Sequence, residues 1–251
     1  MSAGAIETAQ SQPPAQRVAM EHVRGPFAGL LTAQVFFIVI ASFVDETAAG
    51  RALLYTGVLG IMAAGAYLSS SSRHLLVTSL IVLVLLIGAW LGPDLLPGHA
   101  DELLRLGVAG FGYALTAWIV IIVVARQQRV TTDTILGSVN AYLLLALSFM
   151  MLHAAVIVVE PEAYTIGGEP LHSQLHEATS AQRFSTLLYL SFTALTTVGF
   201  GDIVPARPVS RLLISAEAVI GQLYVAILIA RLVSLEANQR AVFAHPPKED
   251  P

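Results

Sequence analysis

Long apolar stretches alternate with short polar segments along the whole chain. Six of these stretches are long enough to cross the hydrocarbon layer of a membrane as a helix, which takes about 20 residues. They lie at residues 26–44, 52–70, 74–92, 104–125, 134–159 and 209–233. The pattern predicts an all-α membrane protein with six transmembrane helices.

The segment between the last two spans contains a shorter apolar run, from Phe184 to Leu195, without proline or glycine. Thr179 followed by Gln182 fits a capping box at the start of a helix. Pro208 suits the first turn of the span that follows. We therefore expect a short helix that re-enters the membrane and ends near Leu195.

A polar run that contains two glycines, residues 196–202, follows this short helix. Irregular backbone at membrane depth is tolerated only where it is buried in protein or lines a water-filled path. Successive carbonyls of ordinary extended backbone alternate sides, whereas an ion pathway needs them on one side. Gly199 and Gly201 allow the backbone hand to alternate without strain. The run therefore predicts an ion selectivity filter.

This run resembles the potassium-channel signature Thr-Val-Gly-Tyr-Gly-Asp, with Phe200 in the place of tyrosine. The resemblance covers residues 134–233 and implies an outer helix, a turret, a pore helix, the filter and an inner helix. A potassium pathway needs four such loops around one axis, and this chain has one, so the resemblance implies a homotetramer. It implies that K⁺ binds the backbone carbonyls of Thr197, Val198, Gly199 and Phe200. The Thr197 hydroxyl would add a further ligand, and Gly201 would complete the outer end of the filter.

Composition agrees with a membrane protein. The chain has 251 residues, of which 55% are hydrophobic and 12% charged, and its mean hydropathy is +0.72. A soluble domain carries about twice that charged fraction. The net charge of -4 therefore describes loops and tails, and the absence of cysteine excludes disulfides and thiolate metal sites. We expect no cofactor, with K⁺ as the permeant ion.

The basic residues set the expected orientation. With a cytoplasmic N-terminus, more arginine and lysine residues lie inside than outside. The resemblance gives the same topology, because the Gly201-Asp202 end of such filters faces outward. Both termini are therefore expected in the cytoplasm, in a multi-pass protein of the inner (plasma) membrane. The compact chain points to a bacterial source.

The chain divides into four expected parts. These are a disordered cytoplasmic N-terminus (1–25), a four-helix transmembrane domain (26–130), the pore domain (131–233) and a short cytoplasmic tail (234–251). The fourth span carries only Arg105 at its outer end and Arg126 and Arg129 at its inner end, so we expect it to lack gating charges and to give weak voltage dependence. Membrane lipids are expected partners, nucleic acid is not, and any regulatory domain would belong to a separate subunit.

Several residues around the filter are expected to support it. Asp202 would form a ring of carboxylates at the outer mouth or hydrogen-bond behind the filter. The resemblance implies Tyr189 as its partner, with simple packing as the alternative for that ring. Thr193 and Thr196 complete the expected filter support.

The resemblance also assigns roles along the inner helix. Gly221 would be a gating hinge, although a glycine in a membrane helix can instead permit close packing. Gln222, Val225 and Ile229 would line the cavity and the gate, and Gln222 would meet water there, because a polar side chain is costly in lipid.

Ionisable residues within the spans need partners. Glu217 is expected to contact the pore helix or a neighbouring subunit, with Ser191, Thr193 or Tyr189 as candidates, and to hold the filter in register; a hydrogen bond without effect on permeation is the alternative. His153 is interpreted as an interhelical hydrogen bond. His172 and His176 in the turret are interpreted as surface histidines, with a pH or metal sensor as the alternative.

Other functions remain in competition with a potassium channel. A nonselective cation channel and a sensor or scaffold with a vestigial pore both explain the six spans. A membrane protease does not, since Gly137-Ser138-Val139-Asn140 does not match a nucleophile motif. We therefore expect no enzyme activity.

Overall fold

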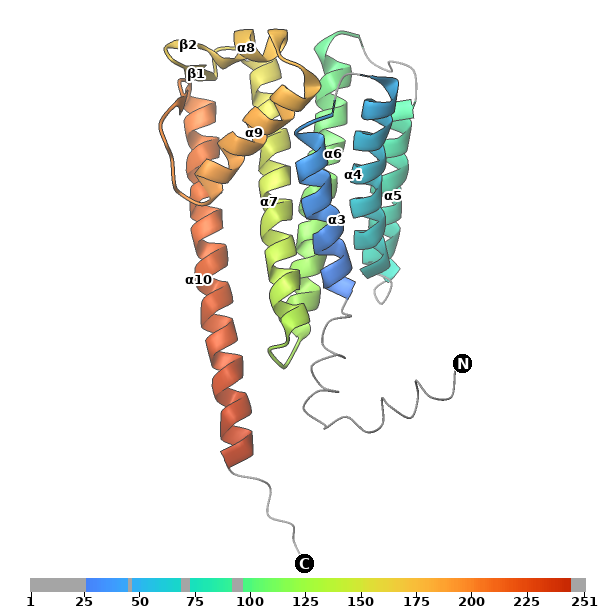
Figure 1. The fold of residues 1–251 in the computed structure, drawn as a ribbon, viewed down its shortest axis with the longest axis vertical. Helices are drawn as coiled ribbons and strands as arrows, with labels where there is room; N and C mark the ends of the chain where they lie inside the picture. The colour runs from blue at the N-terminus through green and yellow to red at the C-terminus, as the bar shows by residue number, and fades with distance from the viewer. Residues whose placement is uncertain (1–25, 45–46, 69–72, 92–96, 245–251) are drawn as a thin grey trace, which may run out of the picture.

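The computed structural model describes residues 26–44, 47–68, 73–91 and 97–244. Residues 1–25, for which we predicted disorder, lie outside this range. Long helices run roughly parallel to one axis of the molecule (Figure 1). They are α3 (Pro26–Ala41), α4 (Ala48–Leu68), α5 (Arg73–Leu91), α6 (His99–Arg126), α7 (Thr132–Val159) and α10 (Pro208–Ala244).

These helices coincide with the predicted spans to within a few residues at most ends. Three of them, α6, α7 and α10 as far as Ala237, are long and apolar enough to cross a membrane. The apolar parts of the other three are shorter within the described residues, namely Phe27–Ala41, Thr56–Gly65 and Leu76–Gly88. The protein is thus a mostly helical membrane protein, and the count of six spans stays a prediction.

Helices α3 to α6 form one block that packs against α7 (Figure 1). Small residues let α6 and α7 approach closely, and the Ser148 hydroxyl donates to the Gly110 carbonyl at 3.1 Å. At the start of α3, the Asn140 amide donates to the Phe27 carbonyl at 2.9 Å, while Asp133 accepts from the Phe27 N–H at 3.2 Å. Polar bonds as well as apolar packing therefore join the block to α7.

The pore helix is α9 (Ser180–Leu195), which slants between α7 and α10 (Figure 1). The predicted capping box is present, with Thr179 and Gln182 bonded to each other's backbone N–H groups. The helix ends at Leu195, as the apolar run predicts. A short helix, α8 (Leu171–Glu177), precedes it in the turret.

A small sheet beside the filter corrects the all-α expectation. Strands β1 (Tyr164–Ile166), β2 (Glu169–Pro170) and β3 (Ile203–Pro205) pair antiparallel in the order β2-β1-β3. Strands of two or three residues are too short to show an alternation of apolar and polar side chains, so the sequence pattern did not predict them. The β1–β2 turn uses Gly167 and Gly168, both with positive φ (60° and 90°), which suits a two-residue hairpin. Strand β3 begins directly after Asp202, so the sheet holds the outer end of the filter.

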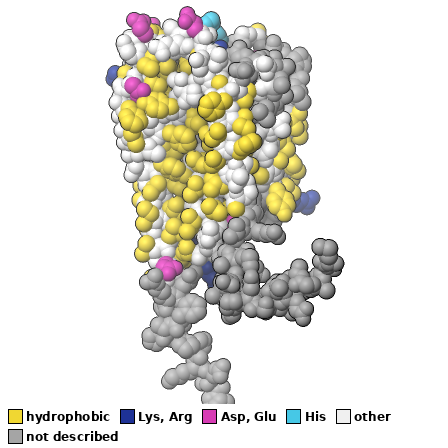
Figure 2. All heavy atoms as spheres, viewed as in Figure 1, with side chains coloured by type: hydrophobic (Ala, Val, Ile, Leu, Met, Phe, Trp, Pro, Cys, Tyr) yellow, Lys and Arg dark blue, Asp and Glu magenta, His cyan; other side chains and the backbone are white. Residues whose placement is uncertain are grey.

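The inner helix α10 has few partners within the chain. Only 11% of its apolar window is buried, against 50% for α6 and 44% for α7. It also continues as a helix to Ala244, beyond the predicted end at residue 233. On the face shown in Figure 2, hydrophobic side chains cover much of the length of the molecule, and acidic side chains lie mainly at the end where Figure 1 places α8 and the sheet. The apolar side of α10 therefore needs lipid or another protein surface to cover it.

Candidate ion pathway

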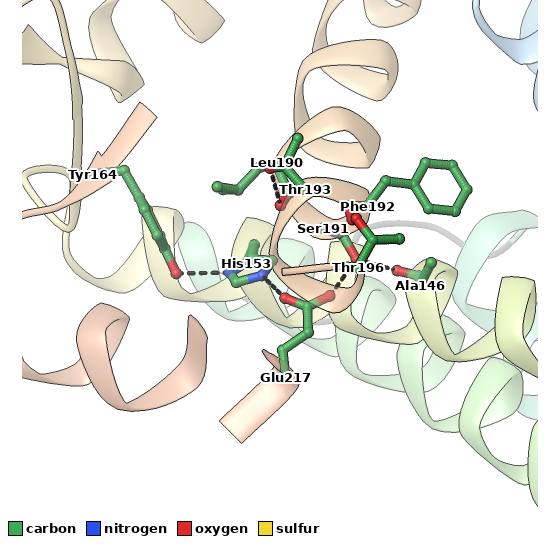
Figure 3. A network of polar contacts seen from close by, with 9 residues as sticks. All are labelled: Ala146, His153, Tyr164, Leu190, Ser191, Phe192, Thr193, Thr196 and Glu217. Carbon is green, nitrogen blue, oxygen red and sulfur yellow. Dashed lines mark hydrogen bonds and ion pairs between the residues drawn. The ribbon is translucent and has the colours of Figure 1, made fainter. Parts of the chain in front are cut away.

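The filter starts from hydrogen bonds to the end of the pore helix. The Thr197 N–H donates to the Ala194 carbonyl at 2.9 Å, and the Gly199 N–H donates to the Thr193 carbonyl at 3.2 Å. The hydroxyls of Thr193 and Thr196 bond one turn back within α9, to Leu190 and Phe192 (Figure 3). These two threonines hold the end of the helix rather than reach into the filter.

Backbone hand alternates along the filter. Thr197, Gly199 and Gly201 have φ of 58°, 51° and 81°, and no residue between them has a positive φ. This is the alternation that lets neighbouring carbonyls face one side. The positive φ of Thr197 was not predicted, because a threonine in this conformation is strained. Its hydroxyl donates to the Thr196 carbonyl at 2.7 Å and accepts from Gln222 at 3.0 Å, which offsets part of that strain.

One face of the filter is open in the single chain. Residues 196–202 are all exposed, with Val198 at 55% and Phe200 at 71%. The Tyr189 hydroxyl donates to Asp202 at 2.7 Å, so the contact implied by the resemblance is present. The Phe200 ring stacks on Tyr189, with centroids 6.1 Å apart. The ring contact with Tyr189 thus positions Phe200, which lacks the hydroxyl that a tyrosine at this place could use for a hydrogen bond.

The hydrogen bond from Tyr189 lowers the pKa of Asp202 below its ordinary 3.8. Stabilisation of the ionised form is complete above the ordinary pKa and is lost as pH falls through the lowered one. We expect Tyr189→Phe to raise this pKa, so that acid reduces inward current at a higher external pH than in the wild type. Current measured while external pH is lowered from 7 toward 3 checks this, and Asp202→Asn should abolish the titration. An unchanged midpoint in Tyr189→Phe would contradict the assignment.

Behind the pore helix lies a fully buried polar network (Figure 3). The Ser191 hydroxyl lies 2.5 Å from Glu217 Oε1 and 2.8 Å from the Ala146 carbonyl. His153 Nε2 lies 2.7 Å from Glu217 Oε2, and its Nδ1 lies 2.7 Å from the Tyr164 hydroxyl. Of the partners expected for Glu217, Ser191 makes the contact, and His153 does form an interhelical hydrogen bond. Tyr164 was missed, since nothing in the sequence ties the turret to this site.

The inner helix meets the end of the pore helix at Gly221. A Cβ built there would lie 2.1 Å from the Leu195 carbonyl oxygen, so only glycine fits. The same carbonyl accepts from the Tyr142 hydroxyl at 3.1 Å. This contact supports the close-packing interpretation of Gly221. Its role as a hinge stays a prediction.

The side chains expected to line the cavity lie further along α10. Gln222 is exposed and donates to the Thr197 hydroxyl at 3.0 Å, and its contact with water in the cavity stays a prediction. Val225 and Ile229 are exposed, at 37% and 56%. All three therefore remain open to a cavity that several subunits would enclose.

The turret histidines His172 and His176 lie on one short helix, and their role as pH or metal sensors stays a prediction. The rings of His172 and His176 lie 6.2 Å apart on α8, and no group of three or more His, Cys, Asp or Glu there could hold a metal ion. Whether they sense pH stays open to test.

Two arginines tie α10 to the rest of the chain. Near its start, Arg207 bonds Glu162 and lies 3.6 Å from Glu160. Further along α10, Arg231 donates to the carbonyls of Ala125 and Gln127 at 2.9 and 2.8 Å. A cation at the carbonyl end of α6 is favourable for the helix dipole. No motif in the sequence predicts this contact.

A short slanted helix, a loop whose backbone hand alternates and a long helix follow one another here, in the order that the potassium-channel resemblance implies. Residues 142–237 match the model of a family described as "Ion channel". This segment, from α7 through the filter to α10, is therefore similar to the ion channels of that family, in agreement with the resemblance to potassium channels. No curated protein and no solved structure matches the chain at a significant level.

Proposed function

We propose that the protein is a potassium-selective channel that conducts K⁺ passively across the plasma membrane. The observation that carries this proposal is the alternation of backbone hand at Thr197, Gly199 and Gly201, within the sequence that resembles the potassium signature. Selectivity for K⁺ rests on carbonyl oxygens that replace the water shell of the ion. The proposed K⁺ ligands are the backbone carbonyls of Thr197, Val198, Gly199 and Phe200.

The working unit we propose is a homotetramer. One chain supplies one filter loop, whose exposed face would line only one side of a pathway. The sparsely covered α10 offers the apolar surface that neighbouring subunits would need. Gln222, Val225 and Ile229 would line the shared cavity, and Asp202 would give four carboxylates at the outer mouth.

The proposed topology has six spans with both termini in the cytoplasm. The acidic residues that flank the filter and the turret would then face outward, and Arg231 and the end of α10 inward. Helices α3 to α6 would form a packing domain. Lipids would be its partners, with any regulatory domain on a separate subunit.

The test of this proposal is the reversal potential of the purified protein in planar bilayers with opposed K⁺ and Na⁺ gradients. A potential near the K⁺ equilibrium value supports the proposal. A potential near zero with retained current would instead identify a nonselective cation channel. No current at any voltage or pH, against a protein-free bilayer as control, would favour a vestigial pore.

We expect only weak voltage dependence. Each charge that crosses the membrane field contributes about 2.3 kcal/mol per 100 mV. In α6, Arg105 is paired at 2.6 Å with Asp101 near the helix start, and Arg126 is the last residue. A conductance–voltage curve recorded over about 100 mV on either side of zero should therefore be shallow. A steep curve that requires several charges per subunit would contradict this.

A further inference from the structure

Both ends of the filter are anchored to one strand, β1. The outer end continues into β3, which pairs with β1 through Ile166 with Ile203 and Tyr164 with Pro205. The inner end follows the pore helix, which the Ser191 hydroxyl joins to Glu217. Glu217 leads through His153 to the side chain of Tyr164, in β1 again (Figure 3). The chain thus forms a closed circuit around the filter.

With Glu217 ionised, one arrangement of protons satisfies the contacts among Tyr164, His153, Glu217 and Ser191, and the single Ser191 proton then points to the carboxylate rather than to the Ala146 carbonyl. The Tyr164 hydroxyl donates to Nδ1 of His153, and the proton of a neutral His153 lies on Nε2 and points to Glu217. The Ser191 hydroxyl donates to the other carboxylate oxygen, and its 2.5 Å separation suits a charge-assisted bond. A doubly protonated His153 would leave the Tyr164 proton without an acceptor among the described residues.

We propose that Tyr164, His153 and Glu217 act as a filter-positioning relay, which holds the pore helix through Ser191 so that the filter keeps its conducting form. Tyr164 touches neither the pore helix nor the filter through its hydroxyl, so its effect on the filter passes through His153. The proposal rests on the channel function proposed above. It adds a link from the turret strand to the filter.

The surroundings of Glu217 isolate this relay from other titratable groups. From α7 it faces His153, and Tyr142 lies within electrostatic reach; from β1 it faces Tyr164. From α9 its hydrogen-bond partner is the Ser191 hydroxyl. The side chains of Tyr164, His153 and Glu217, and that of Ser191, are all fully buried.

The experiment is a double-mutant cycle between two relay ends that do not touch, Tyr164→Phe and Ser191→Ala. Tyr164→Phe removes the contact with His153, and Ser191→Ala removes the contacts with Glu217 and the Ala146 carbonyl. Each variant should therefore speed the decline of K⁺ current during a sustained pulse by about tenfold. The double variant should lose current about as fast as the faster of the two single variants, because both substitutions break the same relay. Tyr113→Phe is the matched control. Its buried hydroxyl has no partner in the described structure, so current decline should stay unchanged.

Multiplying effects, about a hundredfold in the double variant, would overturn the relay and leave two independent structural contacts. An unchanged decline in Tyr164→Phe would also overturn it. If a variant folds too poorly for current recording, the same four proteins can be compared by the thermal midpoint of unfolding of the purified tetramer.

An independent readout separates this inference from the channel function. Nitrogen-15 NMR of labelled protein should show the His153 ring proton on Nε2, as its contacts with Tyr164 and Glu217 require. A proton on Nδ1, or a doubly protonated ring, would overturn the relay even if K⁺ current is normal. If the wild type carries no current while the tautomer and the coupling in thermal stability are as expected, the channel proposal fails and the buried link remains.

Discussion

Gly199→Ala is expected to abolish K⁺ selectivity. Gly199 has φ of 51°, a conformation that costs an alanine about 1–2 kcal/mol in each subunit. Thr197 tolerates a similar φ because its hydroxyl bonds Thr196 and Gln222, and an alanine has no such group. The filter carbonyls should then no longer all point toward the ion pathway, so K⁺ should lose its preferred ligands. The reversal potential should therefore move from the K⁺ equilibrium value toward zero.

Gly167→Ala is the matched control for this result. Gly167 has φ of 60°, so the same substitution introduces the same kind of strain in the turret hairpin rather than in the filter. It should lower stability without changing the reversal potential. Equal loss of selectivity in both variants would show that general destabilisation, and not the filter backbone, causes the effect. Intact selectivity in Gly199→Ala would refute the assigned filter.

Gly221→Ala is expected to have the largest effect on assembly. The added Cβ would lie 2.1 Å from the Leu195 carbonyl oxygen and 2.9 Å from its carbon, which are backbone atoms that a rotamer change cannot move. Overpacking of this kind costs about 1–3 kcal/mol or more. Displacement of the pore-helix end should also remove the Tyr142 bond and the current. The thermal midpoint of the purified protein and its single-channel current measure both.

Gly107→Ala provides the comparison, since a Cβ there meets nothing within 4 Å. In a helix interior this change favours the helix by about 1 kcal/mol. Its thermal midpoint should be equal to or above that of the wild type. A normal midpoint and current in Gly221→Ala would mean that α10 does not approach the pore helix as closely as the structure has it.

The helices and the filter were predictable because each depends on local pattern. Apolar length predicted the long helices, and Thr179 with Gln182 predicted the start of the pore helix. The positive φ of Gly199 and Gly201 follows from the need for carbonyls on one side. Tyr189 with Asp202 came from the resemblance, and Ser191 with Glu217 from the cost of an acid in an apolar helix.

The remaining contacts depend on how distant segments meet. The three-stranded sheet has strands of two or three residues, too short for a periodic signal. Tyr164 and Tyr142 look like ordinary aromatics until the fold brings them to His153 and Leu195. Arg231 resembles any basic residue at the end of a span. Such partners become visible only when the topology is known.

The hydrogen bonds between α7 and the preceding helices limit which chimeric proteins could carry this pore segment. Asn140 and Ser148 of α7 donate to carbonyls of Phe27 and Gly110, which belong to α3 and α6. A chimera that kept only the last two long helices would leave these donors facing lipid, where unpaired polar groups are costly. Grafts that carry the first four helices along with the pore should therefore assemble, whereas a two-helix excision should need apolar replacements at both positions.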